Sequence, residues 1–281
     1  MKKILVPCDF SESAIQAYKF AMNLAALSHA EVLVLKVIDI PFIYETSLGS
    51  TPEYFDPGIF NDLEVDANNN FERLKTKHPR KEMVTFSTLR GAVTVTINQF
   101  AEEHKIDLIV MGTTGASGLK EYWIGSNTEK VVRYSHVPVL AIRKSFDLSK
   151  IKNIVFPTTL HLDQNDLISR VKDLQSFFSA KLHLLLVNTP NNMLRTKDEM
   201  DLMEEFAKHY KLNNYTLNTR NDFNEQDGIM NFAHETKADM IAMGTHGRRG
   251  LAHLFMGSVT EDIVNHVDCP IWTYLVRNNK K

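Results

Sequence analysis

Short apolar runs alternate with amphipathic stretches along the whole chain. Ser11–His29 carries apolar residues near a 3.6-residue period and predicts a helix, whereas Glu31–Asp39 is rich in β-branched residues and predicts a buried strand. The same patterns predict further strands in the first half at Lys3–Cys8, Met83–Leu89, Asp107–Met111 and Val139–Arg143, and further helices at Asp62–Thr76, Val93–His104 and from Asn127 onward.

The second half shows the same alternation. It predicts strands at Asn153–Pro157, Leu182–Asn188, Tyr215–Thr219, Met240–Met243 and Ile271–Leu275, and helices at Gln164–Ser179, Lys197–Tyr210, Gly228–Thr236 and Glu261–His266. Nearly continuous apolar strands that alternate with helices are typical of a parallel sheet covered on both faces. Each half is therefore predicted to be a five-stranded α/β unit.

The second half also repeats the residues of the first. Residues 107–115 return at 239–247 and residues 124–129 at 256–261, both at an offset of 132 residues. The openings, 3–7 and 153–157, match at an offset of 150 residues, so the first half carries 18 more residues before position 112. Two copies of about 140 residues are too long for solenoid repeats. They predict two domains, 1–146 and 147–281.

We place the additional residues of the first copy in the segment 41–63, which is rich in turn formers and aromatic residues. This insert follows the second predicted strand and is expected on the ligand side of the sheet. It could cover a ligand, pack between the domains, or form a surface loop with its own aromatic cluster.

Composition narrows the class of protein. The 281 residues carry 32 Lys and Arg against 34 Asp and Glu, so no overall basic field favours nucleic acid. No stretch approaches the roughly 20 apolar residues of a membrane span, and the opening run Ile4–Val6 is too short for a signal-peptide core. Two cysteines, Cys8 and Cys269, suit a reducing compartment. We expect a cytoplasmic globular protein that binds neither nucleic acid nor membrane.

Candidate chemistry follows the first and fourth predicted strands of each copy. In an open parallel sheet, ligands bind beyond the carboxyl ends of the strands, where the strand order reverses. Gly112 and Gly115 permit positive φ angles and bring backbone N–H groups close to a ligand, and Gly125-Ser126 then opens a helix. A glycine turn followed by a helix start favours an anion, so this segment predicts a phosphate site.

A structural interpretation of the same residues is a capping box. Ser126 and Glu129, like Ser258 and Glu261, have the Ser-x-x-Glu spacing that satisfies helix N–H groups internally. The longer spacing Gly-x2-Gly-x9-Gly-Ser occurs in both copies and favours binding over this alternative. The chain has neither Gly-x4-Gly-Lys-Ser/Thr nor a Gly-x-Gly-x-x-Gly after the first strand, which excludes P-loop enzymes and dinucleotide-dependent dehydrogenases.

The chain resembles the universal stress protein family. The resemblance rests on residues 4–11 (Ile-Leu-Val-Pro-Cys-Asp-Phe-Ser), on residues 32–39 (Val-Leu-Val-Leu-Lys-Val-Ile-Asp) and on the twice-repeated glycine motif. It implies two tandem flavodoxin-like or Rossmann-like α/β domains, each a five-stranded parallel sheet in the order 3-2-1-4-5 with helices on both faces. It also implies an intramolecular pseudo-dimer through the last strands, Val139–Arg143 and Ile271–Leu275, and leaves open a further homodimer of whole chains.

The resemblance further implies an ATP site in the first copy. Asp9 and Val37 would hold the adenosine. The ribose and phosphates would be held by a set of glycine and hydroxyl or amide residues, namely Gly112, Gly115, Gly125, Ser126, Asn127 and Thr128. Mg²⁺ would accompany the phosphates.

The second copy departs from this pattern. Thr159 stands in the position of Asp9, although Val187 keeps the position of Val37. The second copy keeps the glycine motif of the predicted phosphate site, with Arg248-Arg249 in place of Ala116-Ser117 of the first copy. The residues of this motif are Gly244, Gly247, Gly257, Ser258, Val259 and Thr260. We expect the first copy to bind adenine nucleotide better than the second, which is degenerate or prefers another anion.

No catalytic arrangement accompanies this predicted site. His246 is a candidate general base, but the first copy has Thr114 at the equivalent position, so a mechanism shared by both copies would not use it. Asp9 is expected to raise the pKa of the neighbouring Cys8 rather than activate it, and the histidines show no metal-ligand spacing. The sequence thus predicts a stress-response regulator, not an enzyme, that binds ATP without efficient turnover. A protein-interaction module without nucleotide and a slow ATP hydrolase are the alternatives.

Overall fold

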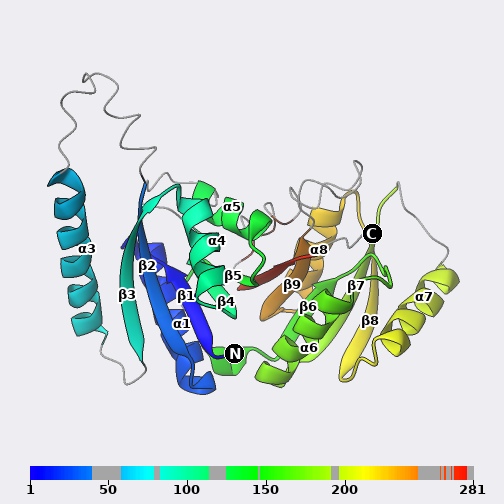
Figure 1. Ribbon diagram of the computed structural model, residues 1–281. Coiled ribbons are helices and arrows are strands. Elements are labelled where there is room, and N and C mark those ends of the chain that lie inside the picture. Colours follow the sequence, from blue (N-terminus) through cyan, green and yellow to red (C-terminus); the bar gives the residue numbers. More distant parts are fainter. Residues whose placement is uncertain are drawn as a thin grey trace. The chain divides into compact units, whose positions relative to one another are not determined.

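The computed structural model describes residues 1–39, 58–78, 83–113, 125–144, 146–190, 196–245, 260, 263, 267 and 269–276. Their contacts divide the chain into two compact units, whose elements are labelled in Figure 1. Most described residues before position 145 belong to the first unit, and the residues from Phe146 onward belong to the second. The predicted pairing of the two halves through their last strands stays a prediction.

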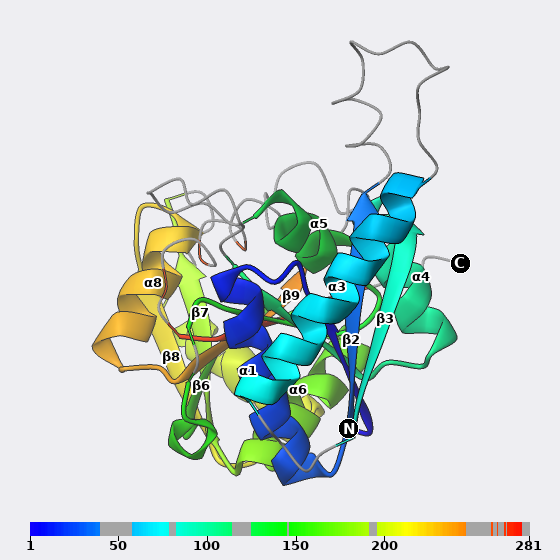
Figure 2. The same cartoon turned by 90° about the vertical axis from the view of Figure 1, so that its left-hand side faces the viewer.

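The first unit is a five-stranded parallel sheet with helices between its strands. The order is β3-β2-β1-β4-β5, which is the order that the resemblance implies. Figure 2 shows α1 and α3 on one side of β2 and β3, with α4 on the other. The strands are β1 (Lys3–Pro7), β2 (Glu31–Asp39), β3 (Val84–Gly91), β4 (Leu108–Gly112) and β5 (Val139–Ile142), and the helices are α1 (Glu12–Ser28), α3 (Gly58–Lys77), α4 (Val93–Glu103) and α5 (Ser126–Tyr134).

The second unit repeats this topology. Its parallel strands lie in the order β8-β7-β6-β9-β10, so the predicted pair of five-stranded α/β units is confirmed. The elements are β6 (Asn153–Pro157), α6 (Asn165–Phe178), β7 (Lys181–Asn188), α7 (Thr196–His209), β8 (Tyr215–Asn221), α8 (Glu225–Glu235), β9 (Met240–Thr245) and β10 (Ile271–Leu275), preceded by the short 3₁₀ turn Leu148–Lys150. Of the predicted helix Glu261–His266, only Ile263 lies within the described residues, and it is helical.

Two predicted helix starts are wrong. The helix α3 begins at Gly58, four residues before Asp62, so the end of the predicted insert is helical. Phe60 is buried in this first turn, and the guanidinium of Arg90 lies 4.7 Å from the centre of its ring. The helix α8 begins at Glu225 rather than Gly228, because the Asn224 side chain accepts the Asp227 N–H at 2.8 Å and caps the helix earlier.

The central strands are buried on both faces, as their continuous apolar runs predict. Ile4, Leu5 and Val6 of β1 are fully buried, and so are Ile154 and Val155 of β6. Burying apolar area stabilises a fold by about 25 cal/mol per Å². These strands therefore form the core of each unit.

The two units share local backbone geometry at a spacing of 150 residues. Phe10 and Leu160 both adopt positive φ angles, of 65° and 61°, directly after the first strand of their unit. The next helices end in left-handed residues at His29 and Ser179, which lie at the same spacing. This register makes Ser13 equivalent to Asp163 and Ala17 equivalent to Leu167.

In each unit, an aspartate at the amino end of the fourth strand accepts hydrogen bonds from the amino end of the first strand. The Asp107 carboxylate accepts the backbone N–H of Lys3 at 3.0 Å, and also that of Lys2. The Asp239 carboxylate accepts the N–H groups of Lys152 and Asn153 at 3.0 and 2.9 Å. The repeated aspartate therefore has a structural role at the edge of the sheet opposite to the carboxyl ends of the strands.

We expect Asp107→Ala and Asp239→Ala each to lower the free energy of unfolding of their own unit by about 2 kcal/mol, because each removes at least two hydrogen bonds to a charged acceptor. Urea unfolding of the full chain measures the effect. The exposed Glu103→Ala on α4 is the control and should change stability by less than about 0.5 kcal/mol. Equal loss in the control and the aspartate variants would contradict the assignment.

Candidate functional site

The carboxyl ends of β1 and β4 adjoin in the first unit. Ile4 pairs with Leu108 and Leu5 with Ile109, so the turn after β1 and the residues after β4 share one edge of the sheet. The strand order reverses at this point, since β2 lies on one side of β1 and β4 on the other. This is where open α/β sheets bind their ligands.

The turn after β1 presents the Asp9 carboxylate. Asp9 is exposed, and its Oδ1 accepts the N–H of Ser11 at 2.9 Å. Phe10 takes a left-handed backbone conformation, which costs about 1 kcal/mol for a residue with a Cβ. Its ring packs near Phe86, at 6.1 Å between ring centres, and Phe86 in turn stacks on Phe71 at 4.5 Å. Aromatic packing offsets the backbone strain and holds the turn that orients Asp9.

Gly112 at the end of β4 touches the first turn of α1. A Cβ on this glycine would lie 2.5 Å from the backbone carbon and oxygen of Ser13. Gly112 does not adopt the positive φ that glycine permits, since among the described glycines only Gly91 has one. Glycine is needed here for the close approach of two backbones, which brings the start of α1 against the end of β4.

The start of α5 meets the same glycine from its other side. The Thr128 hydroxyl donates to the Gly112 carbonyl at 2.8 Å, and the Gly125 N–H donates to the Thr113 carbonyl at 2.7 Å. The N-cap of α5 is Gly125, and it makes no side-chain capping bond. The capping-box interpretation is therefore wrong for the first unit, because Ser126 is already helical. The starts of α1 and α5 both contact Gly112. The start of α1 is capped by the Ser11 hydroxyl, whereas that of α5 has a glycine as its N-cap, and such a helix start favours an anion.

The structure brings several of the predicted residues to this edge. Val37 is half-buried near the end of β2. Two residues before it, the Leu35 carbonyl accepts the Cys8 N–H at 2.8 Å, which joins β2 to the turn after β1. Ser126 and Asn127 are exposed on the first turn of α5. Six residues of the motif or its neighbourhood lie outside the described residues, namely Gly115, Gly247, Gly257, Ser258, Val259 and His246, and so do Arg248-Arg249.

The second unit differs at the same edge. By the 150-residue register α6 would begin at Leu162, but it begins at Asn165, and its N-cap Gln164 makes no side-chain capping bond. The Gln164 N–H instead donates to the hydroxyl of Tyr210 at 3.0 Å, and both residues are buried. The first helical turn that touches Gly112 in the first unit thus has no counterpart in the second.

Side chains fill the space beside the second unit's glycine. A Cβ on Gly244 would lie 2.7 Å from the Leu167 Cδ2 and 3.1 Å from the Val276 Cγ2. Val187 is only 7% exposed, and a Cβ on Gly228 of α8 would lie 2.5 Å from its Cγ1. Val187 is therefore covered, whereas its counterpart Val37 is half-buried.

Sequence reasoning missed two features of this edge. The first is that the backbone of Ser13 packs against Gly112, because no residue type indicates a backbone contact of this kind. The second is a pair of buried hydroxyls. The hydroxyls of Thr113 and Thr245 are buried and have no hydrogen-bond partner among the residues that the structure describes. These threonines lie 132 residues apart, so the repeat itself could have drawn attention to them.

Cys8 is a poor nucleophile in this fold. Burial raises the pKa of its thiol to about 12, and the negative charge of Asp9 adds to the rise, while a hydrogen bond from the Phe10 backbone acts against it. The predicted direction is confirmed, with burial as the larger cause. The thiol stays protonated through the physiological range.

We expect iodoacetamide at pH 8 to modify the half-exposed Cys269 of the folded chain and to spare Cys8. A pKa about three units above the ordinary value lowers the thiolate fraction of Cys8 about 1000-fold. Mass spectrometry of the labelled wild type locates the modified cysteine, and a Cys269→Ser variant isolates the labelling of Cys8, with the unfolded chain in guanidinium as the control. Labelling of folded Cys8 as fast as in the unfolded chain would contradict it.

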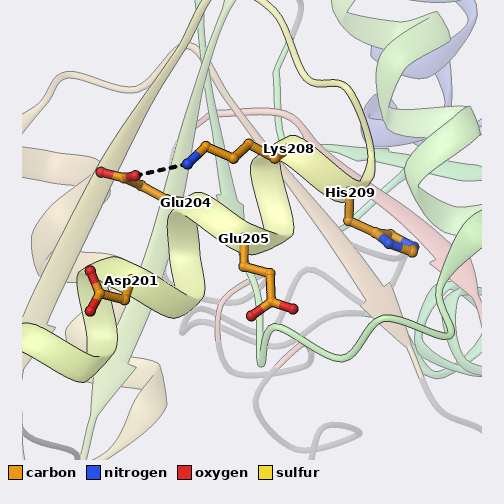
Figure 3. A pocket seen from close by; sticks show the side chains of 5 residues that line it. All are labelled: Asp201, Glu204, Glu205, Lys208 and His209. Atoms are coloured by element: carbon orange, nitrogen blue, oxygen red, sulfur yellow. Dashed lines mark hydrogen bonds and ion pairs between the residues drawn. The ribbon is translucent and has the colours of Figure 1, made fainter.

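A shallow hollow elsewhere on the second unit contains none of the predicted site residues. Figure 3 shows its lining, which comes from α7 alone and includes an exposed ion pair between Glu204 and Lys208 at 3.3 Å; the lining residues are Asp201, Glu204, Glu205, Lys208 and His209. Within the described ranges, no group of three His, Cys, Asp or Glu side chains is arranged to hold a metal ion. No helix in the described part of the chain has the length and apolar character of a membrane span.

Comparison with known proteins gives consistent matches over both halves. The model of the universal stress protein family matches residues 1–143 and 150–274. The universal stress protein MJ0531 of Methanocaldococcus jannaschii is 35% identical over 146 residues, which cover 51% of this chain and 82% of that protein. The universal stress protein Slr1230 of Synechocystis is 21% identical over 300 residues, covering 98% of this chain and all of that protein.

A solved structure matches along the full length. The crystal structure of a universal stress protein from Archaeoglobus fulgidus superposes with a TM-score of 0.74 at 18% identity, covering 99% of this chain and 97% of that one. At this identity the match bears on the fold, and it agrees with the two α/β units described above.

Proposed function

Because the chain belongs to the universal stress protein family, we propose that its first unit binds adenine nucleotide, with ATP as the ligand, at the carboxyl edge of β1 and β4. The observation that carries the proposal is the meeting of two helix starts at Gly112. Among the described residues no side chain caps the start of α5, so its backbone N–H groups suit phosphoryl oxygens. The exposed Asp9 carboxylate lies at the same edge, where it can accept hydrogen bonds from ribose hydroxyls.

The other residues at this edge supply the remaining contacts. Val37 offers an apolar surface to the base, and Ser126 and Asn127 offer polar groups to the phosphates at the start of α5. Gly115 belongs to the same motif and is proposed to contribute a backbone N–H. The described residues do not form a carboxylate cluster that would suit Mg²⁺, so the ion is proposed to arrive on the nucleotide, held by phosphates and water.

We propose binding without efficient turnover, and hence a cytoplasmic stress-response regulator rather than an enzyme. The nearest nucleophile, Cys8, is buried and protonated. The Asp9 carboxylate at this edge already accepts the Ser11 N–H, which suits a positioning role in the turn. A content of two cysteines, Cys8 and Cys269, suits a reducing compartment.

Calorimetry of the nucleotide-free full chain with ATP tests the proposal. We expect saturable binding that weakens at high salt, because phosphate contacts are charge-assisted. Phosphate release in the same sample should be no faster than in an Asp9→Ala variant. Absence of binding would favour the protein-interaction module, and phosphate release that depends on Asp9 would favour the slow hydrolase.

A further inference from the structure

The two units have the same fold but differ in what packs against the glycine at the end of their fourth strand, Gly112 or Gly244. In the first unit, the helical turn at Glu12–Ala14 lies against Gly112, and the Ser11 hydroxyl accepts the Ala14 N–H at 3.3 Å. In the second, Asp163 is equivalent to Ser13 but precedes the helix and is exposed. A first helical turn is thus absent beside Gly244.

A side chain takes the place of that turn. Leu167 is equivalent to Ala17, which is small and fully buried in α1. The longer side chain of Leu167 reaches the backbone of Gly244, where its Cδ2 would be 2.7 Å from an added Cβ. A backbone cannot occupy the same volume, so a helical turn placed like that of the first unit is sterically excluded by Leu167.

Tyr210 holds the displaced helix start in its present position. Its hydroxyl accepts the Gln164 N–H at 3.0 Å, and its carbonyl accepts the Lys172 ammonium at 3.1 Å. Its ring packs edge-on against Phe206 at 4.8 Å between ring centres. The N–H of Gln164 is therefore consumed within the protein, and α6 is fixed at both its start and its middle.

We propose that the second unit is closed to nucleotide by its own chain, through the late start of α6 and the side chain of Leu167, and not merely by the loss of the carboxylate at Thr159. The covered Val187 adds to this closure, because a base could not reach it as it could reach Val37. The full chain then binds one nucleotide, in the first unit. This inference rests on the proposed function of the first unit.

The test is the number of ATP molecules bound per full chain, in the wild type and in Thr159→Asp. Thr159 is half-exposed, so the added carboxylate is compatible with folding, which circular dichroism confirms for each sample. We expect one ATP per chain in both proteins, because a restored carboxylate does not restore the helical turn. Photolabelling with an azido derivative of ATP should mark only peptides from residues 1–144.

Each other outcome overturns a different statement. Two ATP molecules per wild-type chain would overturn the closure of the second unit and leave the proposed function intact. Two in Thr159→Asp and one in the wild type would show that the missing carboxylate alone decides, which also overturns the closure. No binding by the wild type would refute the proposed function and, with it, this inference.

Discussion

Replacing Asp9 with alanine should weaken ATP binding by the full chain about 10- to 100-fold. Hydrogen bonds to a charged group contribute about 1.5–3 kcal/mol each, and every 1.4 kcal/mol is a factor of ten in affinity. Asp9 is exposed at the carboxyl edge of β1, so its carboxylate can meet a ligand without rearrangement of the core. Calorimetry at one fixed salt concentration measures the loss.

The matched control is Thr159→Ala, which removes the side chain at the equivalent position of the second unit. It should leave the affinity and the number of bound ATP molecules unchanged. Because Asp9 also accepts the Ser11 N–H, Asp9→Asn separates the two roles: an amide oxygen can keep the turn but carries no charge. We expect an intermediate loss. Full affinity in Asp9→Ala would contradict the placement of the nucleoside beside this residue.

The fold was predictable because burial leaves a strong pattern. Strands such as β1 and β6 are buried on both faces and appear as unbroken apolar runs, and the long amphipathic periods mark α1 and α6. Helix starts were less accessible. A cap depends on one side chain reaching one N–H, and Asn224 does this for α8 four residues before Gly228, where the sequence pattern placed the start.

The details of the candidate site were only partly predictable. The sequence identified Asp9, Gly112 and Gly125, since their residue types suit an anion site, but it could not separate an uncapped start at Gly125 from a capping box at Ser126, which differ by one residue. It also could not show that the glycines of the two units meet different neighbours. Gly112 and Gly244 occupy the same place in the repeat, and what surrounds them depends on where the preceding helix begins.

This difference in surroundings leads to the second large expected effect. Gly112→Ala should destabilise the first unit by about 3 kcal/mol, because its Cβ would lie 2.5 Å from the backbone of Ser13, which cannot turn aside as a side chain can. The backbone angle is not the obstacle, since Gly112 does not have a positive φ. The first turn of α1 must then move away from β4, so ATP affinity should fall as well, by at least about tenfold.

Gly244→Ala is the internal comparison for this variant. Its Cβ would meet the ends of the Leu167 and Val276 side chains, which can rotate, and alanine also restricts the unfolded chain, so we expect a cost of about 1 kcal/mol or less. Urea unfolding and ATP titration of both full-length variants measure the contrast. If the two alanines cost the same, the backbone of Ser13 does not pack tightly against Gly112, and the structural difference between the two sites would lose its main support.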